Sequence, residues 1–318
     1  REPMIKKNGI FEVVTWDEAY DFITTRLIDI KNKYGADSIG GISSSRATNE
    51  ENYLMQKMLR IPIGTNNIDG CARVCHAPTA WGMQKSFGTG AATNSIEDLK
   101  QTDGIFLFGA NPLKGHPVTG AKIKQAFMKG VTSIVVDPIR TTLADLATHF
   151  LQIRPGTNVA ILNMISHYII KEKLVNEHFI TSYTEKYEEF KNHVEHLDMD
   201  ELSILTGVDK DLVRDAAIAY AKSERAMEFH GLGVTEHFQG SKTVMLLSNL
   251  AMMTGNIGRN GVGLNPLRGQ NNVQGSADMG VQPHQGAGYL DVSKPEIQQY
   301  YAEKYGIEKM PTTNGLKI

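Results

Sequence analysis

The sequence has 318 residues, of which 41% are hydrophobic and 21% charged, the composition of an ordinary globular protein. This length allows about two domains with a sizeable core. The 33 basic residues nearly balance 35 acidic ones, and the formal net charge of -2 excludes a strongly basic nucleic-acid-binding module. The longest apolar runs, residues 159–165 and 244–254, are shorter than the roughly 20 residues of a membrane-spanning helix. We therefore expect no membrane segment in this chain.

The sequence contains two cysteines, Cys71 and Cys75. Two thiols are too few for a four-thiolate zinc or iron–sulfur site, or for a disulfide framework. This cysteine usage indicates a reducing compartment, and we expect a cytoplasmic protein. The sequence starts at Arg1 rather than at methionine, so we also expect it to be part of a longer chain.

The predicted elements alternate between helices and short apolar strands. A helix begins at the capping box formed by Thr15 and Glu18 and ends at Gly35. A strand is predicted at 38–42, a helix at 49–59, and a loop with local helix at most over 61–90. Further strands are predicted at 104–108, 133–136, 150–153 and 226–230, and further helices at 117–128, 158–170, 176–222, 242–253 and 295–304. This alternation predicts an α/β fold with a parallel sheet covered by helices on both faces.

Four of the predicted strands end in segments rich in glycine, amide or carboxylate groups. In open α/β sheets, ligands bind beyond the carboxyl ends of the strands. Any one segment alone is typical of a turn, and none completes a dinucleotide fingerprint or a P-loop. Together they predict a groove for a large polyanionic ligand, in which Asp137 suits the donor edge of guanine. The predicted cofactor-binding residues are Gly109, Asn111, Pro112, Asp137, Pro138, Gly156, Thr157, Asn158, Gly231, Gly233, Val234 and Thr235.

Two further segments carry candidate chemistry. Cys75 and His76 lie side by side in an irregular stretch, where a thiolate beside an imidazole is either a metal ligand or an activated nucleophile. The alternative is that both cysteines are small buried apolar residues. Arg268 lies among glycines and amides in residues 265–275, so its guanidinium could bind a carboxylate with two hydrogen bonds. The alternative there is a solvated surface arginine.

An ordered series of segments resembles the formate dehydrogenase branch of the molybdopterin oxidoreductase family. The matching segments are residues 15–19, 64–67, 71–76, 108–112, 137–138, 156–158, 254–256 and 268–275. The resemblance implies two doubly wound, Rossmann-like cofactor-binding domains. The first would be incomplete and discontinuous, over residues 1–70 and 271–318, and the second continuous over 71–270.

The resemblance also implies a reaction and a role for each candidate residue. Formate would be oxidised to CO2 by two electrons at molybdenum or tungsten, held by a bis(molybdopterin guanine dinucleotide) cofactor. Cys75 would ligate the metal, His76 would accept the proton, and Arg268 would bind formate. A [4Fe–4S] cluster is expected in the complete protein but not in this chain, and an electron-acceptor subunit or domain is the expected partner.

Three alternative functions remain open at this level. A nitrate reductase of the same family also uses a cysteine ligand, and the chain could instead be a non-catalytic cofactor-binding fragment. A cysteine hydrolase using Cys75 and His76 is disfavoured, because such dyads are normally distant in sequence. We also expect the 318-residue chain to be inactive on its own.

Overall fold

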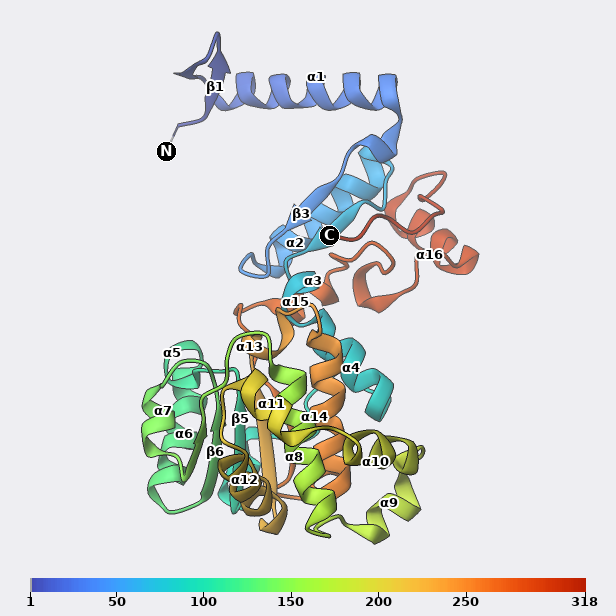
Figure 1. The fold of residues 1–318 in the computed structure, drawn as a ribbon. Helices are drawn as coiled ribbons and strands as arrows, with labels where there is room; N and C mark the ends of the chain where they lie inside the picture. The colour runs from blue at the N-terminus through green and yellow to red at the C-terminus, as the bar shows by residue number, and fades with distance from the viewer. Residues whose placement is uncertain (1) are drawn as a thin grey trace. The chain divides into compact units, whose positions relative to one another are not determined.

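The computed structural model describes residues 2–318, which form two compact units (Figure 1). The split unit consists of the residues up to 73 together with 270–318, and the continuous unit consists of residues 74–269. Among the described residues, no helix is both long and apolar enough to cross a membrane.

The continuous unit is built on a five-stranded parallel sheet with the order β7-β6-β5-β8-β9. Its strands are β5 (Gly104–Phe108), β6 (Thr132–Val136), β7 (His149–Leu151), β8 (Ala226–His230) and β9 (Gly263–Pro266). The chain builds the sheet outward from β5 to β7 and then returns to place β8 on the other side of β5. This is the doubly wound order, and it confirms the predicted α/β class. The switch point lies between β5 and β8.

Helices cover both faces of this sheet (Figure 1). The long helices are α4 (Ala77–Phe87), α6 (Pro117–Met128), α8 (Asn158–Lys171), α12 (Lys210–Lys222) and α14 (Gly240–Thr254). The shorter ones are α5 (Pro112–Gly115), α7 (Thr142–Leu146), α9 (Glu177–Tyr183), α10 (Tyr187–Glu195), α11 (Met199–Thr206), α13 (Leu232–Thr235) and the 3₁₀ turn η3 (Ile96–Lys100). Four helices thus fill residues 176–222, as predicted.

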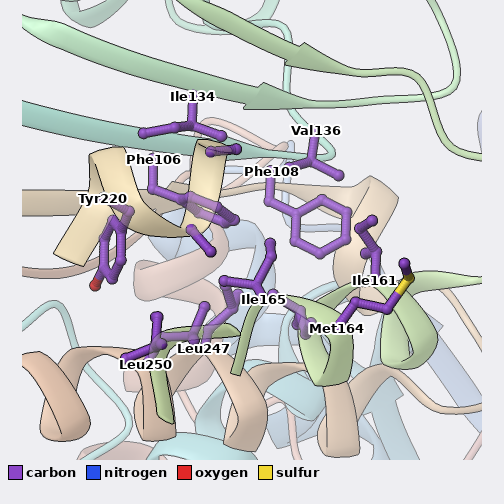
Figure 2. Packing of buried hydrophobic residues seen from close by; sticks show 14 of the residues in the cluster. Phe106, Phe108, Ile134, Val136, Ile161, Met164, Ile165, Tyr220, Leu247 and Leu250 are labelled. Atoms are coloured by element: carbon purple, nitrogen blue, oxygen red, sulfur yellow. The ribbon is translucent and has the colours of Figure 1, made fainter. Parts of the chain in front are cut away.

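The central strand β5 is apolar throughout because both of its faces are buried. In β5, Phe106 and Phe108 point into the core formed with α8, α12 and α14, whereas Ile105 and Leu107 point into the core formed with α6 and α7. Figure 2 shows the first of these cores, with Phe108 beside Ile161 of α8. Each such side chain contributes about 1.5–3 kcal/mol by leaving water.

The split unit contains shorter elements. Its strands are β1 (Met4–Lys7) and β2 (Ile10–Val13), which form an antiparallel hairpin, and β3 (Gly41–Ser43) and β4 (Ile68–Gly70), which pair in parallel. Its helical elements are α1 (Trp16–Tyr34), α2 (Asn49–Met58), α15 (Val273–Asp278), α16 (Pro295–Tyr305), the π-helical turn η2 (Leu59–Ile63) and the 3₁₀ turns η1 (Ala36–Ser38) and η4 (Ala287–Tyr289). The predicted capping box of Thr15 and Glu18 is present at the start of α1.

Arg60 joins the two parts of the split unit that are distant in sequence. Its guanidinium is 1% exposed and donates to Asn66 Oδ1, Gln56 Oε1, and the carbonyls of Gly280, Gln282 and Gln285. Burial lowers the pKa of Arg60 to about 10, so it remains charged at neutral pH. Such bonds from a charged donor are stronger than neutral ones, and they hold residues 280–285 against η2.

The structure differs from the sequence-based elements in three stretches of the chain: one strand is displaced, and two stretches contain elements that were not predicted. The strand predicted at 38–42 is β3, displaced toward the C-terminus because η1 occupies residues 36–38. Residues 61–90, predicted to be a loop with local helix at most, contain β4, α3 (Ala72–Cys75) and the eleven-residue helix α4. A Cβ atom at Gly82 would lie 2.9 Å from the Ser241 carbonyl oxygen, so α4 packs closely on α14 through the glycine that lowers its helix propensity. Residues 255–288 contain β9 and α15, which the amide-rich sequence did not reveal.

Glu228 places a carboxyl group in the apolar core of the continuous unit. The side chain is 1% exposed, the Tyr220 hydroxyl donates to its Oε1, and Oε2 has no hydrogen-bond partner among the described residues. Burial raises the pKa of Glu228 from 4.5 to about 8, although the Tyr220 bond opposes the shift. Glu228 is therefore protonated in the folded protein at neutral pH.

This raised pKa predicts a loss of stability as pH increases. Below pH 4.5 both states bind the proton; between pH 4.5 and about 8 only the folded state does, so the free energy of unfolding falls with rising pH. Glu228→Gln removes this dependence and should stabilise the protein relative to wild type by an amount that grows from pH 5 to pH 8. One pKa unit corresponds to about 1.4 kcal/mol. Urea unfolding at several pH values measures the difference in the free energy of unfolding between variant and wild type, and the exposed Glu224→Gln is the control. Parallel pH profiles of wild type and Glu228→Gln would contradict the prediction.

Candidate functional site

Two glycines bring the ends of β5 and β8 into contact at the switch point. Gly109 has φ +57°, and a Cβ atom there would lie 2.7 Å from the carbonyl carbon of Gly233. The Gly233 N–H donates to Gly109 O at 3.0 Å, and the Gly231 N–H donates to Phe108 O at 3.3 Å. The left-handed conformation and the close approach both require glycine. These glycines therefore shape the backbone of the site.

A pocket of about 250 Å³ opens at this edge of the sheet. It is lined by Gly109, Ala110, Asn111, Asp137, Pro138, Ile139, Ile153, Pro155, Asn158, Gly233 and His237. Six of the twelve predicted cofactor-binding residues thus lie together: Gly109, Asn111, Asp137, Pro138, Asn158 and Gly233. Pro112, Gly156, Thr157, Gly231, Val234 and Thr235 do not line this pocket. The pocket is slightly smaller than the roughly 300–1,000 Å³ of a complete small-molecule site, so it suits one part of a larger ligand.

The polar groups of this pocket have defined roles. Oδ1 of Asp137 accepts the Ile139 N–H at 2.8 Å; burial raises the pKa of Asp137, and this bond opposes the shift. Asn158 donates from Nδ2 to Gly233 O at 3.0 Å. Thr157 stands at the N-cap position of α8, but its hydroxyl donates to Arg154 O at 2.7 Å and makes no cap bond. The first amides of α8 are thus left without a side-chain cap.

A second, more open cavity of about 510 Å³ is lined by Val74, Pro78, Thr235, Glu236 and His237. His237 lines both cavities, so the two are neighbours. Oγ1 of Thr235 is buried without a hydrogen-bond partner among the described residues. The second cavity borders the residues on either side of Cys75. The first cavity thus contains Asp137, and the second lies beside the cysteine segment.

Cys75, at the end of α3, is fully buried and lies against the segment that carries Arg268. A Cβ atom at Gly269 would be 4.0 Å from Cys75 Sγ. Arg268 itself is half-buried. The other cysteine belongs to the split unit, where Cys71 Sγ accepts the Ser45 N–H at 3.1 Å. The structure thus brings two predicted catalytic residues, Cys75 and Arg268, into one region of the continuous unit.

Three histidines hold the backbone around Arg268. His76 Nε2 lies 3.0 Å from Leu267 O, and His116 Nε2 is hydrogen-bonded to Arg268 O. The Leu267 N–H donates to the backbone carbonyl of His230 at 2.7 Å. The Arg268 backbone is therefore fixed on both sides of its Cα atom.

His76 is neutral in this surrounding. Burial, the positive charge of Arg268 and the neighbouring His116 lower the pKa of His76 to about 4, although the bond to Leu267 opposes the shift. Its Nδ1 lies 3.0 Å from Thr79 Oγ1, so both ring nitrogens have partners other than Cys75. This arrangement argues against a thiolate–imidazole pair of the kind a cysteine hydrolase needs.

The sequence analysis missed four residues of this region: Thr79, His116, His230 and His237. Thr79 and His230 are buried and lie 3.1 Å apart between Oγ1 and Nε2. A sequence signal existed for two of them, since His116 follows the Asn111 segment and His230 ends a predicted strand. Thr79 had no such signal, because its helix was predicted to be loop.

A family model matches nearly the whole chain. The family model for molybdopterin oxidoreductase matches residues 1–310. Formate dehydrogenase H of Escherichia coli is 42% identical over 321 residues, covering 100% of this chain and 45% of that protein. F420-dependent formate dehydrogenase 1 subunit alpha of Methanococcus maripaludis is 43% identical over 305 residues, covering 96% of this chain and 44% of that protein. The solved structure of acetylene hydratase from Pelobacter acetylenicus shares the fold, with a TM-score of 0.67 and 24% identity over 81% of this chain and 35% of its own. The chain spans less than half the length of these curated relatives.

The contact between Gly109 and Gly233 predicts a sensitive position. Gly109→Ala should destabilise the continuous unit by about 1–3 kcal/mol, because the new Cβ meets backbone and the residue keeps a positive φ. Gly115→Ala is the matched control, since a Cβ at Gly115 meets nothing within 4 Å. Urea unfolding of the two variants tests the prediction. Equal stability of both would show that the switch point tolerates a side chain.

Proposed function

The chain belongs to the molybdopterin oxidoreductase family, and from that premise we propose that it is the central part of a formate dehydrogenase catalytic subunit. The complete protein would catalyse the two-electron oxidation of formate to CO2. The relatives named above are formate dehydrogenases at 42% and 43% identity, which favours formate over nitrate as substrate.

The observation that supports this proposal most strongly is the proximity of the Arg268 segment to Cys75. A substrate carboxylate needs an anion-binding group beside the thiolate that ligates the metal. Gly269 follows Arg268 directly, and its Cβ position is 4.0 Å from Cys75 Sγ. The guanidinium would bind formate through two parallel N–H···O bonds and orient its C–H bond.

The residues of the continuous unit fit a molybdopterin guanine dinucleotide. We propose that Asp137 accepts hydrogen bonds from the guanine edge in the smaller pocket, and that the uncapped amides of α8 face the phosphates. Thr235 would give its unpartnered hydroxyl to the part of the cofactor that lies nearer Cys75. When bound, the cofactor supplies a molybdenum or tungsten centre that accepts two electrons, and Cys75 would be the ligand from this chain.

The proton released with the electrons needs an acceptor, and we propose Nδ1 of His76. Nε2 faces a carbonyl, which only accepts hydrogen bonds, so it already carries a proton. Nδ1 is bonded to the Thr79 hydroxyl and would bind a proton once that hydroxyl turns away; with a pKa of about 4, His76 would hold this second proton only briefly before passing it on. The electrons would leave through a [4Fe–4S] cluster and an acceptor subunit or domain outside this chain, since two cysteines cannot ligate such a cluster.

The proposed guanine site predicts nucleotide selectivity. GDP should bind this chain more tightly than ADP, because adenine offers no matching pair of donors to a carboxylate. Asp137→Asn should weaken GDP binding roughly tenfold, the effect of losing about 1.4 kcal/mol from a charged hydrogen bond. Asp145→Asn is the control, because Asp145 is an exposed residue paired with Arg140. Equilibrium dialysis gives both affinities, and equal binding of GDP and ADP would exclude the proposed guanine site.

The two cysteines give a matched test of the metal ligand. In the complete protein, Cys75→Ala should reduce formate-dependent dye reduction roughly a thousandfold, equivalent to about 4 kcal/mol of barrier. Cys71→Ala should be far milder, since Cys71 Sγ accepts the backbone N–H of Ser45 within the split unit. Metal content is measured alongside the rate. Comparable losses in the two variants, or nitrate reduction in place of formate oxidation, would count against the proposal.

A further inference from the structure

A buried chain of hydrogen bonds links α4, β8 and the segment after β9. His76 Nε2 lies 3.0 Å from Leu267 O, and His76 Nδ1 lies 3.0 Å from Thr79 Oγ1. Thr79 Oγ1 in turn lies 3.1 Å from His230 Nε2. Thr79 is 1% exposed, His76 4% and His230 0%, so water cannot replace these partners.

The donor and the acceptor of each hydrogen bond follow from the Leu267 carbonyl at one end of this chain of bonds. Leu267 O can only accept, so His76 carries its proton on Nε2. In a neutral imidazole the other nitrogen then accepts, and Thr79 must donate its single hydroxyl proton to His76 Nδ1. The remaining lone pairs of Thr79 can only accept, so His230 donates from Nε2. His230 Nδ1 is then without a proton, which agrees with its lack of a partner among the described residues.

The opposite arrangement, in which Thr79 donates to His230 and accepts from His76, is disfavoured for two reasons. It would require a doubly protonated His76, which is 4% exposed, so a second positive charge would be buried near the cationic Arg268. It would also move the proton of neutral His230 to Nδ1, leaving a buried N–H group with no acceptor, which is rare in folded proteins. The network therefore has one favourable arrangement of protons.

We propose that Thr79 and His230 are positioning residues, which hold His76 as its Nε2–H tautomer so that this ring fixes the backbone of Arg268 beside Cys75. His230 acts at two points, because its side chain orients Thr79 and its backbone carbonyl accepts the Leu267 N–H at 2.7 Å. Thr79 lies one turn after Cys75, at the start of α4. The spacing between the cysteine and the arginine is thus set by α4 and β8 together. The inference rests on the proposed function only for the role assigned to Arg268.

The inference is tested by the tautomeric states of His76 and His230. Long-range proton–nitrogen correlation spectra of ¹⁵N-histidine-labelled protein at pH 7 distinguish the protonated ring nitrogen from the bare one. His76→Gln and His230→Gln assign the signals. We expect both rings as Nε2–H tautomers in the wild type. An Nδ1–H tautomer or a doubly protonated ring at His76 would overturn the inference without any further variant.

Thr79 offers a conservative pair of variants. Thr79→Ser keeps the hydroxyl and should preserve the wild-type spectrum. Thr79→Val keeps the shape but leaves His76 Nδ1 without its donor, so the ring can turn away from Leu267 O and should show a mixture of tautomers. Hydrogen exchange of the Leu267 amide should become roughly tenfold faster in Thr79→Val, because the segment loses a fixed partner. Identical spectra and exchange in the two variants would also overturn the inference. These measurements need neither metal nor formate, so their outcome is independent of whether the complete protein oxidises formate.

Discussion

The parallel pairing of β5 with β8 is the constraint on which the rest of the continuous unit depends. It joins strands from separate halves of the chain and brings Gly109 and Gly233 so close that neither can carry a side chain. The same pairing places His230 at the end of β8, where its backbone and its ring both hold groups around Arg268. The pocket lined by Asp137 and the segment after β9 that carries Arg268 therefore both depend on this strand pairing.

The electrostatic character of the site follows from burial. Desolvation keeps His76 and His230 neutral, and the charge of Arg268 lowers the pKa of His76 further. A guanidinium among neutral donors and acceptors in a partly dry site attracts a small anion more strongly than it would in water. Formate carries one negative charge and two oxygens in a plane, which matches the fork of an arginine.

Sequence patterns predicted the elements that carry strong local signals. The five-residue strands β5 and β8 and the helices α6, α8 and α14 were found because apolar runs between glycines or prolines mark them. The β9 strand and α4 were missed because glycine, proline and amides lower local propensity, and packing on β8 and α14 stabilises them instead. Of the strand-end residues, Asp137 and Asn158 line the same pocket, whereas Thr157 turns back to Arg154; their role in cofactor binding stays a prediction. Thr79 and His230 could not be paired from the sequence, because their contact joins residues 151 positions apart.

The kinetics of an Arg268→Lys variant of the complete protein test the central claim most directly. Wild type and variant should be compared at matched metal content, with formate varied and dye reduction as the measured rate. A lysine offers a point charge in place of a two-pronged donor, so the account predicts a higher KM, a lower kcat, and a kcat/KM reduced roughly tenfold or more. An unchanged kcat/KM for formate would remove Arg268 from the site and contradict the assignment of formate to the region beside Cys75.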